Sequence, residues 1–85
     1  MPRFFLHSRD RASLNTDVEG QEFPGIEEAR AEALRVGKQA IADHLKGGGK
    51  LSAVIARSIE IADETGMLKS VVTFAEAAEA DDHRP

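Results

Sequence analysis

Hydrophobic and polar positions follow two different periods along this chain, and each period predicts its own kind of element. From Ile26 to Lys46 the apolar residues recur every third or fourth position, so they occupy one half of a helical wheel. Glu27 and Glu28 suit the positive N-terminal end of such a helix, and the glycines at 47–49 suit its end. The pattern predicts one long amphipathic helix.

Four short stretches alternate in polarity or are rich in β-branched and aromatic residues, which predicts strands. These stretches are residues 3–8, 21–23, 58–62 and 68–74. Asp-x-x-Gly sequences at 17–20 and 63–66 predict tight turns, because Asp accepts hydrogen bonds from nearby backbone and Gly adopts positive φ. Residues 9–16 are expected to be a loop. Residues 51–56 fit either a helical turn or a strand.

The order of these elements indicates an α+β fold of type ββαββ, with one long helix packed on one face of a small antiparallel sheet. Alternation places six large apolar residues beneath the helix: Phe4, Leu6, Ile59, Ile61, Val72 and Phe74. Gly37 lies within the apolar stripe, which indicates close contact between helix and sheet. We expect residues 1–75 to form this single domain and residues 76–85 an acidic, poorly ordered tail, which is either a frayed helix or disordered.

Composition narrows the class of protein. The chain has 85 residues, 41% hydrophobic and 31% charged, which suits one small globular domain. Its net charge is −4, and residues 76–82 carry four acids and no base, so the folded part is near neutral. Nucleic acid is therefore an unlikely partner. No apolar run is long enough for a membrane span or a signal peptide, and there is no cysteine, so we expect a cytoplasmic protein.

Two histidines are candidates for chemistry. His7 ends the first strand, where it is either a base or metal ligand beside Asp10, Asp17 or Glu19, or a strand residue with a backbone partner. His44 lies in the helix stripe, as a pocket residue or as a core residue near the helix C-terminus. For both residues the structural interpretation is favoured, because no second histidine stands at ligand spacing.

Other motifs of catalysis do not match. The acids near residue 17 do not follow the spacing of a calcium loop, and the glycines at 47–49 follow a helix instead of preceding one. Ser8, Ser13 and Ser70 have no supporting set for nucleophilic attack. We therefore expect no enzyme, no catalytic residue, no metal and no cofactor.

The sheet face away from the helix offers a possible interaction surface. Phe5, His7, Met67 and Val71 are expected there, apolar enough to contact a second copy of the chain or another protein. An edge strand pairing with its own copy is the alternative contact. The expectation is a non-catalytic interaction module, forming a homodimer.

Several segments resemble a family of short bacterial proteins known only as a domain of unknown function. They are "MPRFFLH", "DVEGQEFPGIEEARAEAL", "SIEIADETG" and "VVTF", and the resemblance covers residues 1–75. It implies the domain boundaries and no particular activity.

A weaker resemblance links "EFPGIEEARAEALRVGKQAIADHL" to HicB-like antitoxin domains. That resemblance implies a regulator that binds a toxin or nucleic acid, with Arg3, Arg9 and Arg11 expected at one end of the sheet.

Overall fold

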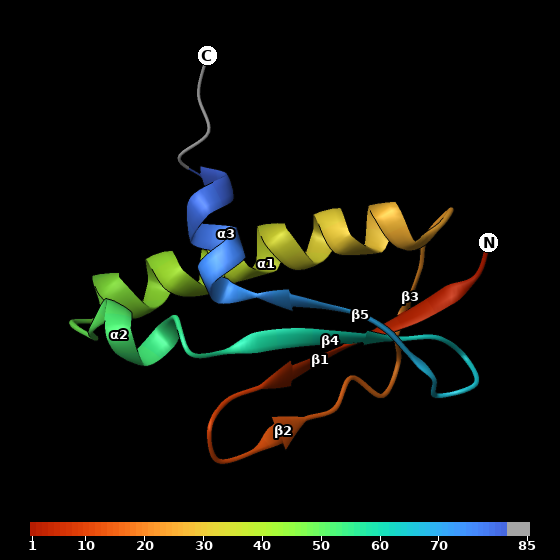
Figure 1. Ribbon diagram of the computed structural model, residues 1–85, viewed down its shortest axis with the longest axis horizontal. Coiled ribbons are helices and arrows are strands. Elements are labelled where there is room, and N and C mark those ends of the chain that lie inside the picture. The colour runs from red at the N-terminus through yellow and green to blue at the C-terminus, as the bar shows by residue number, and fades with distance from the viewer. Residues whose placement is uncertain (82–85) are drawn as a thin grey trace.

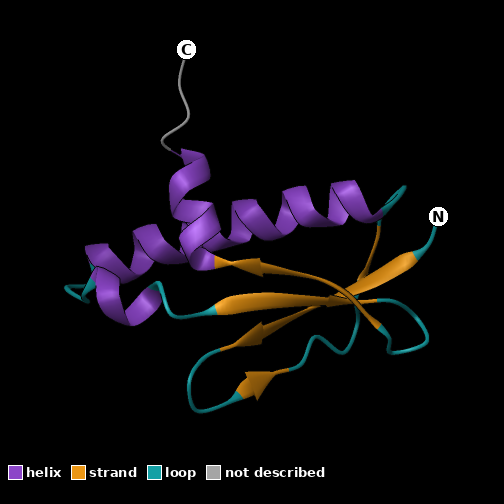
Figure 2. Cartoon of the chain, in the orientation of Figure 1, coloured by secondary structure: helices purple, strands orange, loops and turns teal. Residues whose placement is uncertain are grey.

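The fold is known from a computed structural model that describes residues 1–81 of the chain. Its elements in chain order are β1 (Arg3–Arg9), β2 (Leu14–Asn15), β3 (Gln21–Glu22), α1 (Ile26–Lys46), α2 (Leu51–Val54), β4 (Ser58–Ala62), β5 (Leu68–Thr73) and α3 (Phe74–Asp81). The long helix α1 runs along one side of the sheet, and α3 crosses it (Figure 1). Helices and strands form separate layers, which Figure 2 shows by colour. The α+β class with one long helix and a small antiparallel sheet is confirmed.

The sheet is antiparallel, with the strand order β2-β1-β4-β5. Strand β1 is central to it, because β4 pairs along one edge from Phe5↔Ala62 to Arg9↔Ser58. Its other edge is shared. β2 pairs with the C-terminal end of β1, and β3 pairs with its N-terminal end. The middle of this edge faces the loop at residues 16–20.

Strand β2 lies inside residues 9–16, where the sequence predicted only a loop. Asp10 closes the turn that precedes it, because its Oδ1 accepts hydrogen bonds from the backbone N–H groups of Ala12 and Ser13, each at 2.9 Å. These bonds return the chain onto β1 without any glycine. The ambiguity over residues 51–56 is resolved as the short helix α2, followed by a turn.

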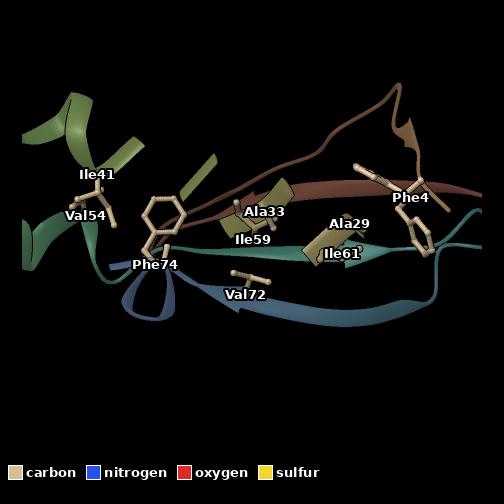
Figure 3. Packing of buried hydrophobic residues seen from close by; sticks show 11 residues of the cluster. Phe4, Ala29, Ala33, Ile41, Val54, Ile59, Ile61, Val72 and Phe74 are labelled. Atoms are coloured by element: carbon tan, nitrogen blue, oxygen red, sulfur yellow. The ribbon is translucent and has the colours of Figure 1, made fainter. Parts of the chain in front are cut away.

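The expected core beneath the helix is confirmed. Five of its six members are buried, and Leu6 is half-buried against them. The helix adds Ala29 and Ala33, which lie over Ile59 and Ile61 of β4 (Figure 3). Because these two helix residues are alanines, α1 can approach the sheet closely.

Helix α3 continues past residue 75, into the segment that the sequence assigned to an acidic tail. Thr73 and Glu76 form a capping box at the start of α3: the Glu76 N–H donates to Thr73 Oγ1 and the Thr73 N–H donates to Glu76 Oε1, both at 3.0 Å. Ala77 is fully buried against the core. Phe74 therefore begins a helix instead of ending a strand. Residues 82–85 of the expected tail lie outside the described residues.

Gly37 serves a different contact from the one expected. A Cβ atom at Gly37 would stand 2.9 Å from the Cβ of Ala77 and 3.6 Å from the Phe74 ring. Both neighbours belong to α3, so the missing side chain permits a close crossing of two helices and not the approach of helix to sheet. The prediction was wrong because it had no second helix to consider.

Candidate functional site

The sheet face away from α1 carries an apolar surface that a bulge enlarges. Cross-strand partners point to the same face, so Phe5, Ala62 and Leu68 form one row across three strands. Leu68 belongs to this row because the register shifts between Ile61 and Ala62. Strict alternation had placed Leu68 on the helix side, and the bulge corrects this.

We call this surface the open-face patch and define it as Phe5, Leu68 and Val71. Leu68 is 53% exposed and Val71 40%, while Phe5 is half-buried. Ala62, at the centre of the row, is buried although it lies outside the core cluster. The strand register places Phe5 and Val71 on this face together with Leu68, whereas Met67 precedes β5 and is not part of that register.

The border of the patch is polar. Glu60 of β4 lies between His7 and Val71 in the next row, and it forms an ion pair with Arg9. The His7 ring stacks on the Phe5 ring, with centroids 6.4 Å apart and planes 20° apart. The open face therefore has an apolar end and a charged end.

His7, the fourth expected residue, has a backbone partner. Its Nδ1 accepts a hydrogen bond from the Asp17 N–H at 3.0 Å. Because a backbone amide is always the donor, Nδ1 carries a lone pair here and any proton of the neutral ring is on Nε2. Of the three acids expected near His7, Asp17 is the one that this bond joins to it.

The Asp17 carboxylate binds backbone. It accepts hydrogen bonds from the N–H groups of Leu6, Glu19 and Gly20 at 3.2, 3.3 and 3.1 Å. Partial burial by itself raises the pKa of this carboxyl, but the three backbone bonds and the nearby His7 outweigh it, and the pKa is lowered. Gly20 has φ +70°, as the Asp-x-x-Gly pattern predicts. Asp17 is therefore a structural anion of the loop.

His44 lies elsewhere, at the C-terminal end of α1. Its Nε2 is buried and has no hydrogen-bond partner among the described residues. A Cβ at Gly49 would stand 2.2 Å from this nitrogen, so the glycine turn covers the ring closely. The structure does not bring the two imidazoles into one site.

A groove on the helix side was not expected. Its volume is 340 Å³, and its lining includes Leu6, Asp17, Glu32, Val36 and Arg57. We call it the helix–loop groove, because α1 forms one wall and the loop at residues 16–20 the other. A signal was present in the sequence: Glu32, Val36 and Ala40 are spaced by four, so they form a row along one helix face.

Two of the four charged residues that line this groove, Asp17 and Glu32, are engaged by the protein itself. Glu32 accepts two hydrogen bonds from Arg35, at 3.0 and 2.6 Å, and these bonds lower the pKa of the Glu32 carboxyl. Asp17 is held by backbone. Neither histidine lines the groove. Within residues 1–81, no three acids or histidines gather in a way that could hold a metal ion.

The arginines do not form the cluster that was expected at one end of the sheet. Arg3 and Arg9 stand at opposite ends of β1. Arg3 is 3.4 Å from Glu22, and Arg9 is paired with Glu60. These partners neutralise both arginines. In the described part of the chain, no helix is long and apolar enough to cross a membrane.

The fold and its surfaces define a small α+β domain: one long helix over an antiparallel sheet, an apolar patch on the open face, and a groove beside the helix. The chain belongs to the family described as a domain of unknown function, DUF6894, whose model matches residues 3–75. No curated protein and no solved structure matches it.

Proposed function

We propose that this protein is a non-catalytic interaction module of the cytoplasm that forms a homodimer through the open-face patch. One observation carries the proposal: the bulge in β5 turns Leu68 onto the same face as Phe5 and Val71. Large exposed apolar side chains gathered on one face are typical of protein interaction sites. A two-fold axis would place this self-complementary face against its own copy.

The face is favoured over the edge of β5 because that edge is partly blocked. The Phe74 N–H donates to the Arg57 carbonyl at 3.0 Å, so by alternation the Thr73 N–H points away from β4. Glu76 binds this N–H. Arg30 of α1 reaches the Ser70 hydroxyl and lies 3.5 Å from Glu76, which places charge beside the edge. Such charges discourage strand pairing between copies.

A protein partner is favoured over nucleic acid. The two arginines of β1 are each paired with a glutamate, which weakens the basic surface that a HicB-like regulator would present to a phosphate backbone, although Arg11 stands beside Arg57 in a separate pocket. A toxin-like protein bound on the open face is the alternative occupant. It would compete with the second copy for the same surface.

Sedimentation equilibrium tests the proposal on the full chain and on two matched variants. The wild-type chain is expected to sediment at twice 9.2 kDa at micromolar concentration. Leu68→Lys is expected to shift it to the monomer, because the row of Leu68, Ala62 and Phe5 holds no acid, and burying an unpaired ammonium costs several kcal/mol. Val18→Lys is the control, since Val18 is 84% exposed and lies outside the patch. A wild-type monomer, or equal weakening by both variants, would refute the homodimer.

A further inference from the structure

We propose that His7 and Asp17 form a pH-sensitive latch that holds the loop at residues 16–20 against the middle of β1. This part of the edge has no strand partner, because β2 pairs at Ser8 and Arg9 and β3 pairs at Arg3 and Phe4. The loop fills the gap with one residue. Asp17 donates its N–H to His7 Nδ1 at 3.0 Å and accepts the Leu6 N–H at Oδ2 at 3.2 Å.

The two hydrogen bonds respond to acid in different ways. Nδ1 accepts only while it carries a lone pair, and in an imidazolium both ring nitrogens are donors. When His7 is protonated, its Nδ1–H and the Asp17 N–H face each other, and this hydrogen bond is lost. The Asp17 carboxylate keeps its negative charge as the pH falls, since backbone donors and the His7 charge lower its pKa despite its burial.

The charged groups around the imidazole determine which group the protonated ring can donate to. Asp17 faces it from the loop, Glu60 faces it from β4, and Arg9 follows on β1 and is paired with Glu60. β5 contributes Val71 to the row of His7, and the two residues of β2, Asn15 and Leu14, pair with Ser8 and Arg9; none of the three is charged. The protonated His7 ring can no longer accept at Nδ1, but it can donate an N–H to the Asp17 carboxylate. In the neutral state this carboxylate accepts the Leu6 N–H, so the loop must move for it to face the ring.

The latch controls two surfaces. Asp17, Glu19 and Gly20 form the loop wall of the helix–loop groove, so a shift of the loop changes the width of this groove. It also frees the Leu6 N–H, which leaves the middle of β1 open to an added strand. These consequences belong to the single chain, and they do not require self-association.

NMR on the ¹⁵N-labelled full chain tests the latch. The ring nitrogen shifts of His7 are expected to report the Nε2–H tautomer in the neutral state. Hydrogen-exchange protection of the Asp17 amide is expected to fall roughly five- to tenfold as the imidazole titrates in the same sample, which is the loss of about one hydrogen bond. The Nδ1–H tautomer, or Asp17 protection that stays constant while the ring titrates, would overturn the proposal.

Two variants separate the latch from a general effect of acid. His7→Asn places an amide oxygen near the position of Nδ1, so the Asp17 amide is expected to stay protected at both ends of the titration. His7→Gln places its amide near Nε2 and is expected to leave Asp17 unprotected throughout, with core methyl shifts unchanged. If His7→Gln unfolds, the test depends on the acid sensitivity of Asp17 protection in the wild-type and His7→Asn chains. Equal acid sensitivity of these two chains would contradict the latch.

Discussion

At the scale of single residues, Asp17 shows how one carboxylate can replace a strand. Its side chain accepts the Leu6 N–H that a neighbouring strand would otherwise accept, and it also binds the N–H groups of Glu19 and Gly20. Charged hydrogen bonds of this kind are worth about 1.5–3 kcal/mol each when buried, and less at a partly exposed site. The gap in the β1 edge is therefore closed by a side chain.

Removing this charge is expected to lower stability in a pH-dependent way. The folded-state pKa of Asp17 lies below its ordinary value of 3.8, so its contribution is full above that value and is lost as the pH falls through the folded pKa. Asp17→Asn should cost roughly 1–2 kcal/mol at pH 7, and this difference should shrink toward pH 3. Urea denaturation at a series of pH values measures it.

The control for this measurement is Asp43→Asn, on the surface of α1, where the carboxylate accepts a hydrogen bond from the Gln39 side chain. That substitution should change stability by less than about 0.5 kcal/mol. The stability of the Asp17→Asn variant still falls in acid, because the pKa values of Asp10 and Asp63 are lowered as well, mainly by hydrogen bonds from Ser13 and Thr65. A constant gap between the wild type and Asp17→Asn from pH 7 to pH 3 would refute the role of Asp17.

At the scale of elements, α3 depends on the capping box at its first turn. Thr73→Ala removes the hydroxyl that accepts the Glu76 N–H and should cost about 1 kcal/mol. The loss is expected to concentrate in residues 74–79, and backbone chemical shifts would report it as reduced helicity there. Thr73→Ser keeps the hydroxyl and serves as the control. Equal helicity in the alanine and serine variants would show that the box contributes nothing.

The crossing of α1 and α3 depends on the absence of a side chain at Gly37. Alanine there gains about 1 kcal/mol of helix propensity, but its Cβ would stand 2.9 Å from that of Ala77, and overpacking of this kind costs about 1–3 kcal/mol. We expect Gly37→Ala to displace α3, and the double variant with Ala77→Gly to restore it. A thermodynamic cycle measured by denaturation gives the coupling. Additive effects would show that the two residues do not meet.

The sequence predicted the elements whose signals are local and repeated. The helix at Ile26–Lys46 has the bounds expected from its apolar period, and the Asp-x-x-Gly turns form where the pattern places them. The start of α3 was missed although Thr73-x-x-Glu76 is a capping-box signature, because the alanines that follow resemble a tail. Local sequence signals are therefore sufficient to predict these elements, and the Thr73-x-x-Glu76 capping box is such a signal for the start of α3.

At the scale of the whole molecule, the surfaces depend on relations that no local pattern contains. The bulge that turns Leu68 outward shows itself only when β4 and β5 are paired. The helix–loop groove exists because β2 and β3 divide one edge of β1, and the loop between them stands beside α1. The interaction role expected for Phe5, His7, Met67 and Val71 therefore stays a prediction, and the groove had no counterpart among the expectations from the sequence.

Contact between two copies at the open-face patch is the central claim, and isotope-filtered NMR tests it most directly. A mixed sample of ¹³C-labelled and unlabelled chains should give intermolecular NOEs from the Phe5 ring to the methyl groups of Leu68 and Val71. The same sample should give none to the methyl groups of Leu45 or Val18, which are exposed away from the patch. Filtered NOEs confined to α1, or none at a concentration where the chain sediments as a dimer, would contradict the account.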